Sequence, residues 1–214
     1  MYKVLAHEHS LVNDFLAEIR DKSVQTDRAR FRKNIERIGQ IMAYEISKHL
    51  PRIEKNINTP LGTHKSQVLQ QQPVLATILR AGLAMHSGFL NFFDHAESAF
   101  ISAYRKHTCS HEFEIVVEYL ASPNLNNRIL ILIDPMLATG QSIHLSYKAL
   151  LTRGKPSVVY VAGLISSSKG IEYVQQHLPE AHIFVADVDN DLNNESYIVP
   201  GIGDAGDLCY GEKL

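Results

Sequence analysis

The residues with the clearest chemical potential follow an apolar run near the middle of the chain. Ile129 to Ile133 is continuous and apolar, typical of a strand covered on both faces, and Asp134 comes directly after it. A short loop of small residues follows, and a helix is predicted from Ser142 to Leu151. Unpaired N–H groups at a helix N-terminus bind phosphate, Thr139 and Ser142 add hydroxyl donors, and Gly140 lets the backbone approach an anion closely. Asp134 is placed to accept hydrogen bonds from neutral hydroxyls such as those of a ribose.

An ordinary strand–turn–helix joint with a capping Ser or Thr explains the same pattern. Two other phosphate-binding motifs are excluded. The Gly-Lys-[Ser/Thr] ending of a Walker loop is missing, and no Gly-x-Gly-x-x-Gly fingerprint follows the strand. From the residues alone, a phosphate loop and a purely structural joint are about equally supported.

A second candidate lies after the apolar run Val74 to Leu79. Arg80 follows this predicted strand and stands two residues before Gly82. A cation at the end of a strand, beside a glycine, suits a diphosphate, although a surface arginine at a strand end explains it equally. Further along, Arg105 precedes a polar stretch, Lys106 to His111, that could form a mobile lid.

The chain from Asp189 to Leu214 differs in texture from the rest, because it is rich in Gly, Asp and Asn. It is predicted to be an ordered loop that covers a site. Within it, Tyr197 to Asp207 combines glycines with paired aspartates, which also suits a tight surface loop or an acidic loop of the calcium-binding type. The soft ligands His107, Cys109 and His111 stand close together, but a structural zinc site needs four ligands at more regular spacing, so no metal site is predicted there.

The elements that must position these residues alternate along the chain. Thr26 to Leu50 has apolar residues three and four apart and predicts a long helix capped by Thr26 or Asp27, and Ser10 to Arg20 predicts a shorter one. The polar stretch Pro51 to Gln72 leaves room for a short hairpin. Further strands are predicted at 74–79, 99–103, 112–119, 129–133, 158–164 and 183–186, and further helices up to about 93 and at 142–151 and 169–177.

Short apolar strands alternating with helices indicate an α/β fold, a doubly wound parallel sheet flanked by helices. Ligands in such sheets bind beyond the carboxyl ends of the strands. We predict one domain over 1–214, with N-terminal helices in 1–50 and a distinct tail in 189–214.

The composition narrows the function classes. The chain has 214 residues, of which 45% are hydrophobic, and a net charge of −2, so a large core is expected and no general affinity for nucleic acid. Two cysteines make no disulfide framework. No run approaches the roughly 20 apolar residues that span a bilayer, and a cytoplasmic protein is predicted.

The segment Asp134 to Ser142 resembles the phosphoribosyl-diphosphate motif of the uracil phosphoribosyltransferases, Asp-Pro-Met-Leu-Ala-Thr-Gly-Gly-Ser, at eight of nine positions. Three more segments resemble that family in the same order: Ile78 to Leu83, the pair Tyr104 and Arg105, and Tyr197 to Asp207. The resemblance spans roughly residues 26 to 212. It implies a type I phosphoribosyltransferase fold.

The resemblance also implies roles for individual residues. The 5′-phosphate would lie on the backbone of Ala138 to Ser142, the ribose hydroxyls would face Asp134, and Arg80 and Arg105 would hold the diphosphate, with Arg105 counted among the catalytic groups. The residues implied for 5-phosphoribosyl 1-diphosphate are Arg80, Arg105, Asp134, Pro135, Met136, Leu137, Ala138, Thr139, Gly140, Gln141, Ser142 and Asp204. Those implied for uracil are Ile198, Gly203, Asp204 and Ala205.

The implied reaction joins uracil to the phosphoribosyl group and releases diphosphate. The proton on the attacking nitrogen of uracil would pass to Asp204, to a water molecule or to the diphosphate. Mg²⁺ is expected through the diphosphate oxygens, with no dedicated set of protein ligands. A homodimer or higher homo-oligomer is implied, with no membrane or nucleic-acid partner.

One residue departs from the family motif. Gln141 stands where the family usually has glycine, and the sequence allows two outcomes. If this position needs a positive φ, Gln would cost on the order of 1 kcal/mol. If φ is negative, Gln costs little.

Three rival hypotheses for the function remain: a catalytically weakened homologue, a regulator of the same fold that binds UMP and RNA, and the same class of enzyme acting on another base.

Overall fold

The computed structural model describes residues 2–107 and 113–213, and for residues 103–107 and 113–117 the description is confined to the backbone. Its centre is one mostly parallel sheet in the strand order β1-β10-β9-β7-β4-β5-β6, with the short β8 paired to β9. Only the pairing of β5 with β6 in this sheet is antiparallel within the described residues. The strands are β1 (Tyr2–Val4), β4 (Val74–Leu79), β5 (Glu97–His107), β6 (Phe113–Ala121), β7 (Ile129–Ile133), β8 (Met136–Leu137), β9 (Val158–Ser167) and β10 (His182–Asp189).

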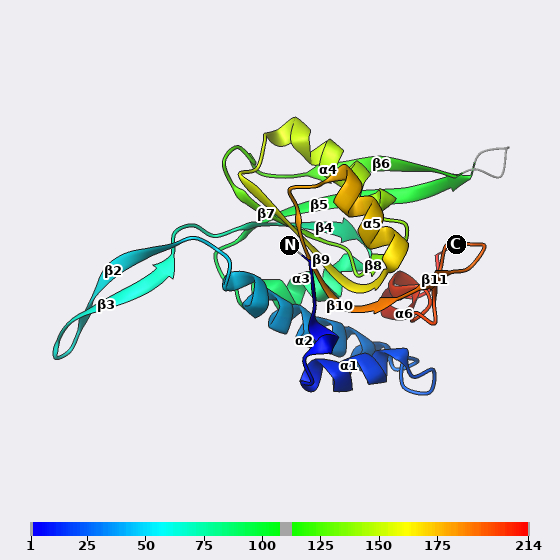
Figure 1. Ribbon diagram of the computed structural model, residues 1–214, viewed down its shortest axis with the longest axis horizontal. Coiled ribbons are helices and arrows are strands. Elements are labelled where there is room, and N and C mark those ends of the chain that lie inside the picture. Colours follow the sequence, from blue (N-terminus) through cyan, green and yellow to red (C-terminus); the bar gives the residue numbers. More distant parts are fainter. Residues whose placement is uncertain (1, 108–112, 214) are drawn as a thin grey trace.

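Helices cover both faces of this sheet (Figure 1). One layer holds α1 (Leu11–Arg20), α2 (Arg28–Ser47) and α3 (Gly82–Leu90), and the other holds α4 (Gln141–Leu150) and α5 (Ser168–His177). Short 3-10 turns, η1 (Leu5–His7) and η2 (Leu151–Arg153), follow β1 and α4. This arrangement confirms the predicted doubly wound α/β class.

The continuous apolar run of β7 is explained by burial on both faces. Side chains alternate along a strand, so Ile129, Ile131 and Ile133 pack in the core on the side of α1, α2 and α3. Leu130 and Leu132 pack in the opposite core with residues of α4 and α5. A strand in the middle of a doubly covered sheet needs apolar side chains at every position.

The N-terminal helices begin at side chains that cap them. Ser10 caps α1 by accepting from the N–H of Val12, and Asn13 reciprocates by accepting from the N–H of Ser10. Asp27, one of the two predicted caps, accepts from the N–H groups of Ala29 and Arg30 at the start of α2. Both predicted helices are confirmed with slightly shorter bounds.

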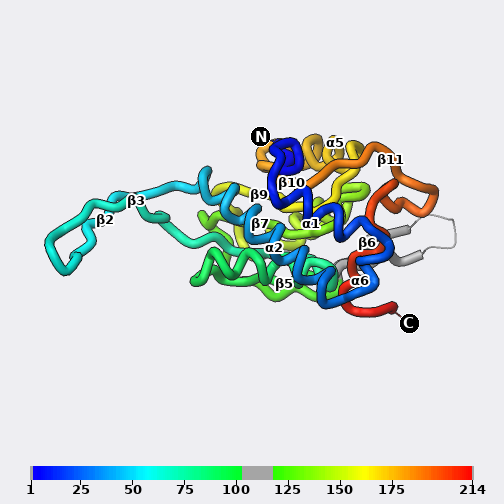
Figure 2. Tube along the Cα trace, turned by 90° about the horizontal axis from the view of Figure 1, so that it is seen from below, coloured from blue at the N-terminus to red at the C-terminus, as the bar shows by residue number. Residues whose placement is uncertain are grey.

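The polar stretch after α2 forms the antiparallel hairpin of β2 (Arg52–Thr59) and β3 (Gly62–Leu69), paired along its whole length. It is longer than the short hairpin that the sequence left room for. Both views show it projecting away from the sheet and helices (Figures 1 and 2). Most of its side chains are exposed, which explains their polar composition.

The C-terminal tail was predicted as loop, and that prediction is partly wrong. It holds two short paired strands, β11 (Asp191–Leu192) and β12 (Ile198–Val199), and a last helix, α6 (Ala205–Tyr210). Asp204 caps α6 by accepting from the N–H of Asp207. The six-residue helix escaped prediction because it is too short for a helical apolar period to be recognised.

Candidate functional site

The predicted site residues gather where the order of the strands reverses. In the sheet, β4 lies between β5 and β7. Along the chain β5 follows β4 directly, whereas β7 comes later and lies on the opposite side of β4. Parallel pairing brings the carboxyl ends of β4 and β7 to the same edge, so Arg80 and Asp134 follow adjacent strands. Crevices at such reversal points are where open α/β sheets bind ligands.

The loop between β7 and α4 has the features expected of a phosphate loop. Gly140 stands directly before α4 and has a φ of +75°, a backbone conformation that residues with an L side chain rarely adopt. Gln141 is the first residue of α4 and is not among the residues with positive φ, so the substitution of the family's glycine carries no left-handed strain. This decides the alternative that the sequence left open.

A hollow lies at this loop and at the start of α4. It is lined by Asp134, Met136, Leu137, Ala138, Thr139, Gly140, Ser142 and Ile143. Seven of these eight were predicted, and Ile143 was not. Pro135 and Gln141 do not line it. The carbonyl oxygen of Pro135 instead accepts from the N–H groups of Leu164 and Ile165 in β9.

Asp134 is buried, with 8% of its surface exposed. Its Oδ1 accepts from the N–H of Met136 at 3.2 Å, and its own N–H donates to the carbonyl of Ala162. The carboxylate is therefore fixed by the loop that follows it. Such a group can present its oxygens to neutral hydroxyl donors in the hollow.

Three residues that the sequence reading did not single out support the phosphate loop from β9 and α5. The hydroxyls of Ser166 and Ser167 donate to the carbonyl oxygens of Leu137 and Ala138 at 3.2 and 2.5 Å. A Cβ on Gly170 would lie 2.6 Å from the carbonyl oxygen of Ala138, so only glycine allows this close approach. The run of serines at the end of an apolar strand was the signal that could have revealed this support.

Arg80 and Ala81 form the short loop between β4 and α3, called the Arg80 loop, and Arg80 contacts the tail. Its Nη2 bonds to Oδ1 of Asp207 at 2.8 Å, and its Nη1 donates to the carbonyl oxygen of Gly211 at 3.3 Å. The side chain remains 39% exposed, so a ligand can reach it. The Leu79–Arg80 peptide bond is cis.

Three polar side chains near the Arg80 loop contact one another in a row, with the buried His86 in the middle. Nδ1 of His86 lies 2.6 Å from Oγ1 of Thr77, and its Nε2 lies 3.1 Å from Oγ of Ser98, which links α3 to β4 and β5. Burial lowers the pKa of His86 to about 4, so this imidazole is neutral near pH 7. The sequence reading missed it because no spacing connects these three positions.

The predicted base loop folds beside the Arg80 loop, since a Cβ on Gly206 would lie 3.8 Å from Nη2 of Arg80. Gly201 and Gly203 have φ values of +59° and +86°, and the Val199–Pro200 peptide bond is cis. Ile198 and Ala205 are buried, whereas a Cβ on Gly203 would meet, among the described residues, only Leu208 at 3.9 Å. At Gly203 the loop therefore exposes its backbone and no side chain.

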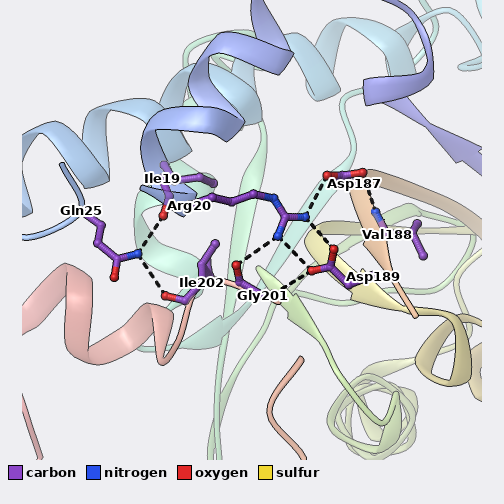
Figure 3. A network of polar contacts seen from close by, with 8 residues as sticks. All are labelled: Ile19, Arg20, Gln25, Asp187, Val188, Asp189, Gly201 and Ile202. Atoms are coloured by element: carbon purple, nitrogen blue, oxygen red, sulfur yellow. Dashed lines mark hydrogen bonds and ion pairs between the residues drawn. The ribbon is translucent and has the colours of Figure 1, made fainter. Parts of the chain in front are cut away.

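Side chains far away in the sequence hold this loop (Figure 3). Arg20 in α1 donates to the carbonyl oxygen of Gly201 and bonds to Asp187 and Asp189 of β10. Gln25 donates to the carbonyl oxygen of Ile202 at 3.3 Å. The sequence reading gave these residues no role.

A further contact of this kind fixes α6. Arg32 of α2 donates to the carbonyl oxygen of Cys209 at 2.6 Å. Cys209 itself is buried, and burial raises the pKa of its thiol to about 12. The neutral thiol of Cys209 is therefore favoured near pH 7.

Two predicted features fall outside the described side chains. Arg105 belongs to β5 and pairs by its backbone with Ile115 of β6, but its side chain is not described. The set of His107, Cys109 and His111 lies within or beside residues 108–112, outside the description.

Over the described residues, no group of three or more His, Cys, Asp or Glu side chains could hold a metal ion. In that same part of the chain, every helix is too short or too polar to cross a membrane.

Comparison with known proteins agrees with this geometry. The family model described as uracil phosphoribosyltransferase matches residues 6–212. A uracil phosphoribosyltransferase of Porphyromonas gingivalis is 52% identical over 98% of both chains, and one of Bacillus pumilus is 36% identical over the full length of both. A solved structure of an Aquifex aeolicus protein is 29% identical, with a TM-score of 0.88 over 99% of this chain and 98% of that one.

Proposed function

The chain belongs to the uracil phosphoribosyltransferase family, and we propose that it transfers the phosphoribosyl group of 5-phospho-α-D-ribose 1-diphosphate to uracil. The products are UMP and diphosphate. One observation supports the assignment of the site: the β7–α4 loop with its hollow and the Arg80 loop follow adjacent strands at the reversal point of the sheet, and Arg80 contacts the tail.

The hollow at the β7–α4 loop suits the 5′-phosphate and the ribose. Backbone N–H groups at the start of α4 and the hydroxyls of Thr139 and Ser142 can donate to phosphate oxygens. Asp134, buried at the mouth of the loop, can accept from the ribose hydroxyls. These contacts hold the sugar while its anomeric carbon reacts, which lowers the entropic part of the barrier.

The leaving diphosphate is assigned to Arg80 and Arg105. The bond between the anomeric carbon and a diphosphate oxygen breaks, so negative charge grows on the leaving group and nearby cations stabilise it. The exposed part of Arg80 supports this role, and its ion pair with Asp207 keeps the guanidinium beside the tail until a ligand competes for it. The role of Arg105 rests on the family motif.

Mg²⁺ is proposed as the companion of the diphosphate. It prefers phosphate oxygens and water and needs at most one or two carboxylates, and Asp134 is a buried carboxylate lining the hollow. When bound, it neutralises charge on the diphosphate.

Uracil is assigned to the tail. Backbone groups at Ile198, Gly203 and Ala205 can match the donor between two carbonyl acceptors on the edge of uracil. Cytosine has a different edge and would leave buried groups unpaired, which is costly. The ring nitrogen forms the bond to the anomeric carbon and loses its proton, and Asp204, water or the diphosphate accepts it.

Three further proposals concern the protein as a whole. We propose that residues 1–214 act as one domain, because α1, α2 and α6 share one core with the sheet. A homo-oligomer and a cytoplasmic location stay predictions from the family resemblance and the composition.

The assay mixes the purified protein with labelled uracil, 5-phosphoribosyl 1-diphosphate and Mg²⁺, and measures UMP. We expect UMP from uracil and little product from cytosine or hypoxanthine. Arg105→Ala should lose most of this activity while its circular dichroism spectrum is unchanged. Absence of UMP from folded protein would contradict the proposal, and RNA retention on a filter would then support the regulator.

A further inference from the structure

We infer that Arg20 is a positioning residue that sets the shape of the uracil-binding loop, an inference that rests on the proposed function. Arg20 lies at the end of α1, far from the tail in sequence. Its Nη1 bonds to the carbonyl oxygen of Gly201 at 3.0 Å and to Oδ2 of Asp189 at 2.9 Å. Its Nη2 bonds to Oδ1 of Asp189 at 3.0 Å and to Oδ2 of Asp187 at 2.8 Å (Figure 3).

Both polar groups of the Gly201 backbone depend on this arrangement. The carbonyl oxygen accepts from Arg20, and the N–H donates to Oδ2 of Asp189 at 3.0 Å. Asp189 is itself held by both terminal nitrogens of Arg20, and only 9% of its side chain is exposed. Gly201 therefore cannot shift without breaking contacts to the guanidinium or to its partner carboxylate.

Gly201 occupies the middle of the segment that would read the base. It lies three residues after Ile198 and two before Gly203. Within the described residues, β12 pairs only with the equally short β11, so the segment has little regular secondary structure of its own. A loop with so few regular backbone pairings takes its shape from side chains that contact it, and Arg20 makes the charged contact at Gly201.

The chemistry of the contact selects arginine. Asp187 and Asp189 stand on one strand and both point at the guanidinium (Figure 3). A planar guanidinium can serve two carboxylates and a carbonyl at fixed angles, whereas an ammonium ion is a point charge on a flexible stem. Lysine at this position would preserve the charge and lose the geometry.

Gln25 makes a second, weaker contact of the same kind. Its Nε2 donates to the carbonyl oxygens of Ile19 in α1 and Ile202 in the loop, at 3.0 and 3.3 Å. Two neighbouring residues of the loop are thus held from the region at the end of α1. The N-terminal helix, which carries none of the residues assigned to substrate, controls the loop that binds uracil.

Steady-state kinetics of Arg20→Lys and Arg20→Met test the inference once the wild-type protein has been shown to form UMP. We expect the KM for uracil to rise on the order of 10-fold in Arg20→Lys and further in Arg20→Met, because a displacement of about 1 Å can cost up to 100-fold. The KM for 5-phosphoribosyl 1-diphosphate should stay unchanged. Gln25→Ala should change the KM for uracil in the same direction by less.

Arg30→Met is the matched control. Arg30 of α2 also binds a carboxylate, that of Glu18 in α1, through two of its nitrogens. In the described structure this pair does not contact the uracil-binding loop. Its loss should leave both KM values unchanged. An Arg20 effect reproduced by Arg30→Met would show that loosening the N-terminal helices is sufficient, and would overturn the specific role of Arg20.

Hydrogen exchange gives a readout that does not depend on turnover. Arg20→Lys should exchange faster at residues 198–204, with residues 129–142 as in the wild type. Unchanged exchange at 198–204 together with an unchanged KM for uracil would overturn the inference, as would equal rises in the KM of both substrates. A wild-type protein without activity would contradict the proposed function instead, and the exchange pattern would still decide the role of Arg20.

Discussion

The phosphate loop and the base loop are built in opposite ways, although they serve one site. The phosphate loop, Asp134–Ser142, joins a buried strand to a helix that follows it directly, so its shape comes from its own segment and from the adjoining β9 and α5. The base loop, residues 197–207, has one short strand pairing and one short helix. Besides contacts to nearby residues such as Asp189, it is held by Arg20, Gln25 and Arg80, which are 127 to 181 positions away.

This difference has a consequence for how the two substrates are bound. A loop that joins a strand directly to a helix and is bonded to β9 has little room to shift, and it suits the phosphate and sugar, whose reacting atom needs a fixed position. A loop held by a few distant side chains can open and close at a lower free-energy cost. This suits the uracil site, because uracil must enter it and the product UMP must leave it. The two loops should therefore respond differently to local and to distant substitutions.

Arg80 contacts the tail and is assigned to the diphosphate, so its loss should have the largest effect. Arg80→Met removes a cation from the diphosphate and the ion pair with Asp207 from the tail. We expect kcat/KM for 5-phosphoribosyl 1-diphosphate to fall roughly 100- to 1000-fold, as for other donors to developing charge. The KM for uracil should rise as well, and steady-state kinetics with each substrate varied in turn measure both.

Asp207→Asn separates the two roles of Arg80. It weakens the contact to the tail and leaves the guanidinium free for the diphosphate. We expect a higher KM for uracil with kcat close to that of the wild type. If Asp207→Asn lost as much kcat as Arg80→Met, the contact with the tail rather than the charge would explain the catalytic role of Arg80.

Two glycines with positive φ compare the regions directly. Gly140→Ala adds the strain of a left-handed residue, about 1–2 kcal/mol, and places Cβ 2.7 Å from the carbonyl oxygen of Gly170. Gly203→Ala adds the same kind of strain, but the nearest atom would be Cδ1 of Leu208 at 3.9 Å. Both are left-handed in the wild type, with φ of +75° and +86°.

We expect Gly140→Ala to lower kcat/KM for 5-phosphoribosyl 1-diphosphate by roughly 100-fold, because a rigid, crowded loop must shift. Gly203→Ala should raise the KM for uracil by only about 10-fold, since a loop with open space can absorb the strain. Initial rates of UMP formation measure both. Equal losses in the two variants would contradict the idea that crowding distinguishes the two loops.

The same difference explains what the sequence could reveal. The bounds of β4 and β7, at 74–79 and 129–133, were predicted as they stand, because a strand buried on both faces has a local apolar signature. A local rule about helix N-termini made residues 134–142 a candidate phosphate loop, and the resemblance to the family motif favoured it over a purely structural joint. The base loop was recognised only by its resemblance to a family motif.

The supports of the base loop were not predictable. No periodicity or spacing connects Arg20 with Gly201, which are 181 positions apart, and an arginine at the end of an amphipathic helix reads as a surface residue. Thr77 and His86 are close in the sequence, yet the contacts of the buried imidazole were also not predicted, since its other partner, Ser98, belongs to another strand. Contacts between distant segments need the three-dimensional structure.

Gln141→Gly, which restores the residue that the family usually has, should have the smallest effect. Gln141 begins α4 outside the positive-φ region and does not line the hollow, so glycine relieves no strain and opens no space. We expect kcat/KM to change by less than about twofold, as for substitutions away from special features. The free energy of unfolding should fall by roughly 0.5 kcal/mol, because glycine at the start of a helix loses more backbone entropy on folding. Urea unfolding and initial rates measure the two quantities. A tenfold gain in kcat/KM would show that the Gln141 side chain obstructs the phosphate site, and would make this chain a weakened member of its family.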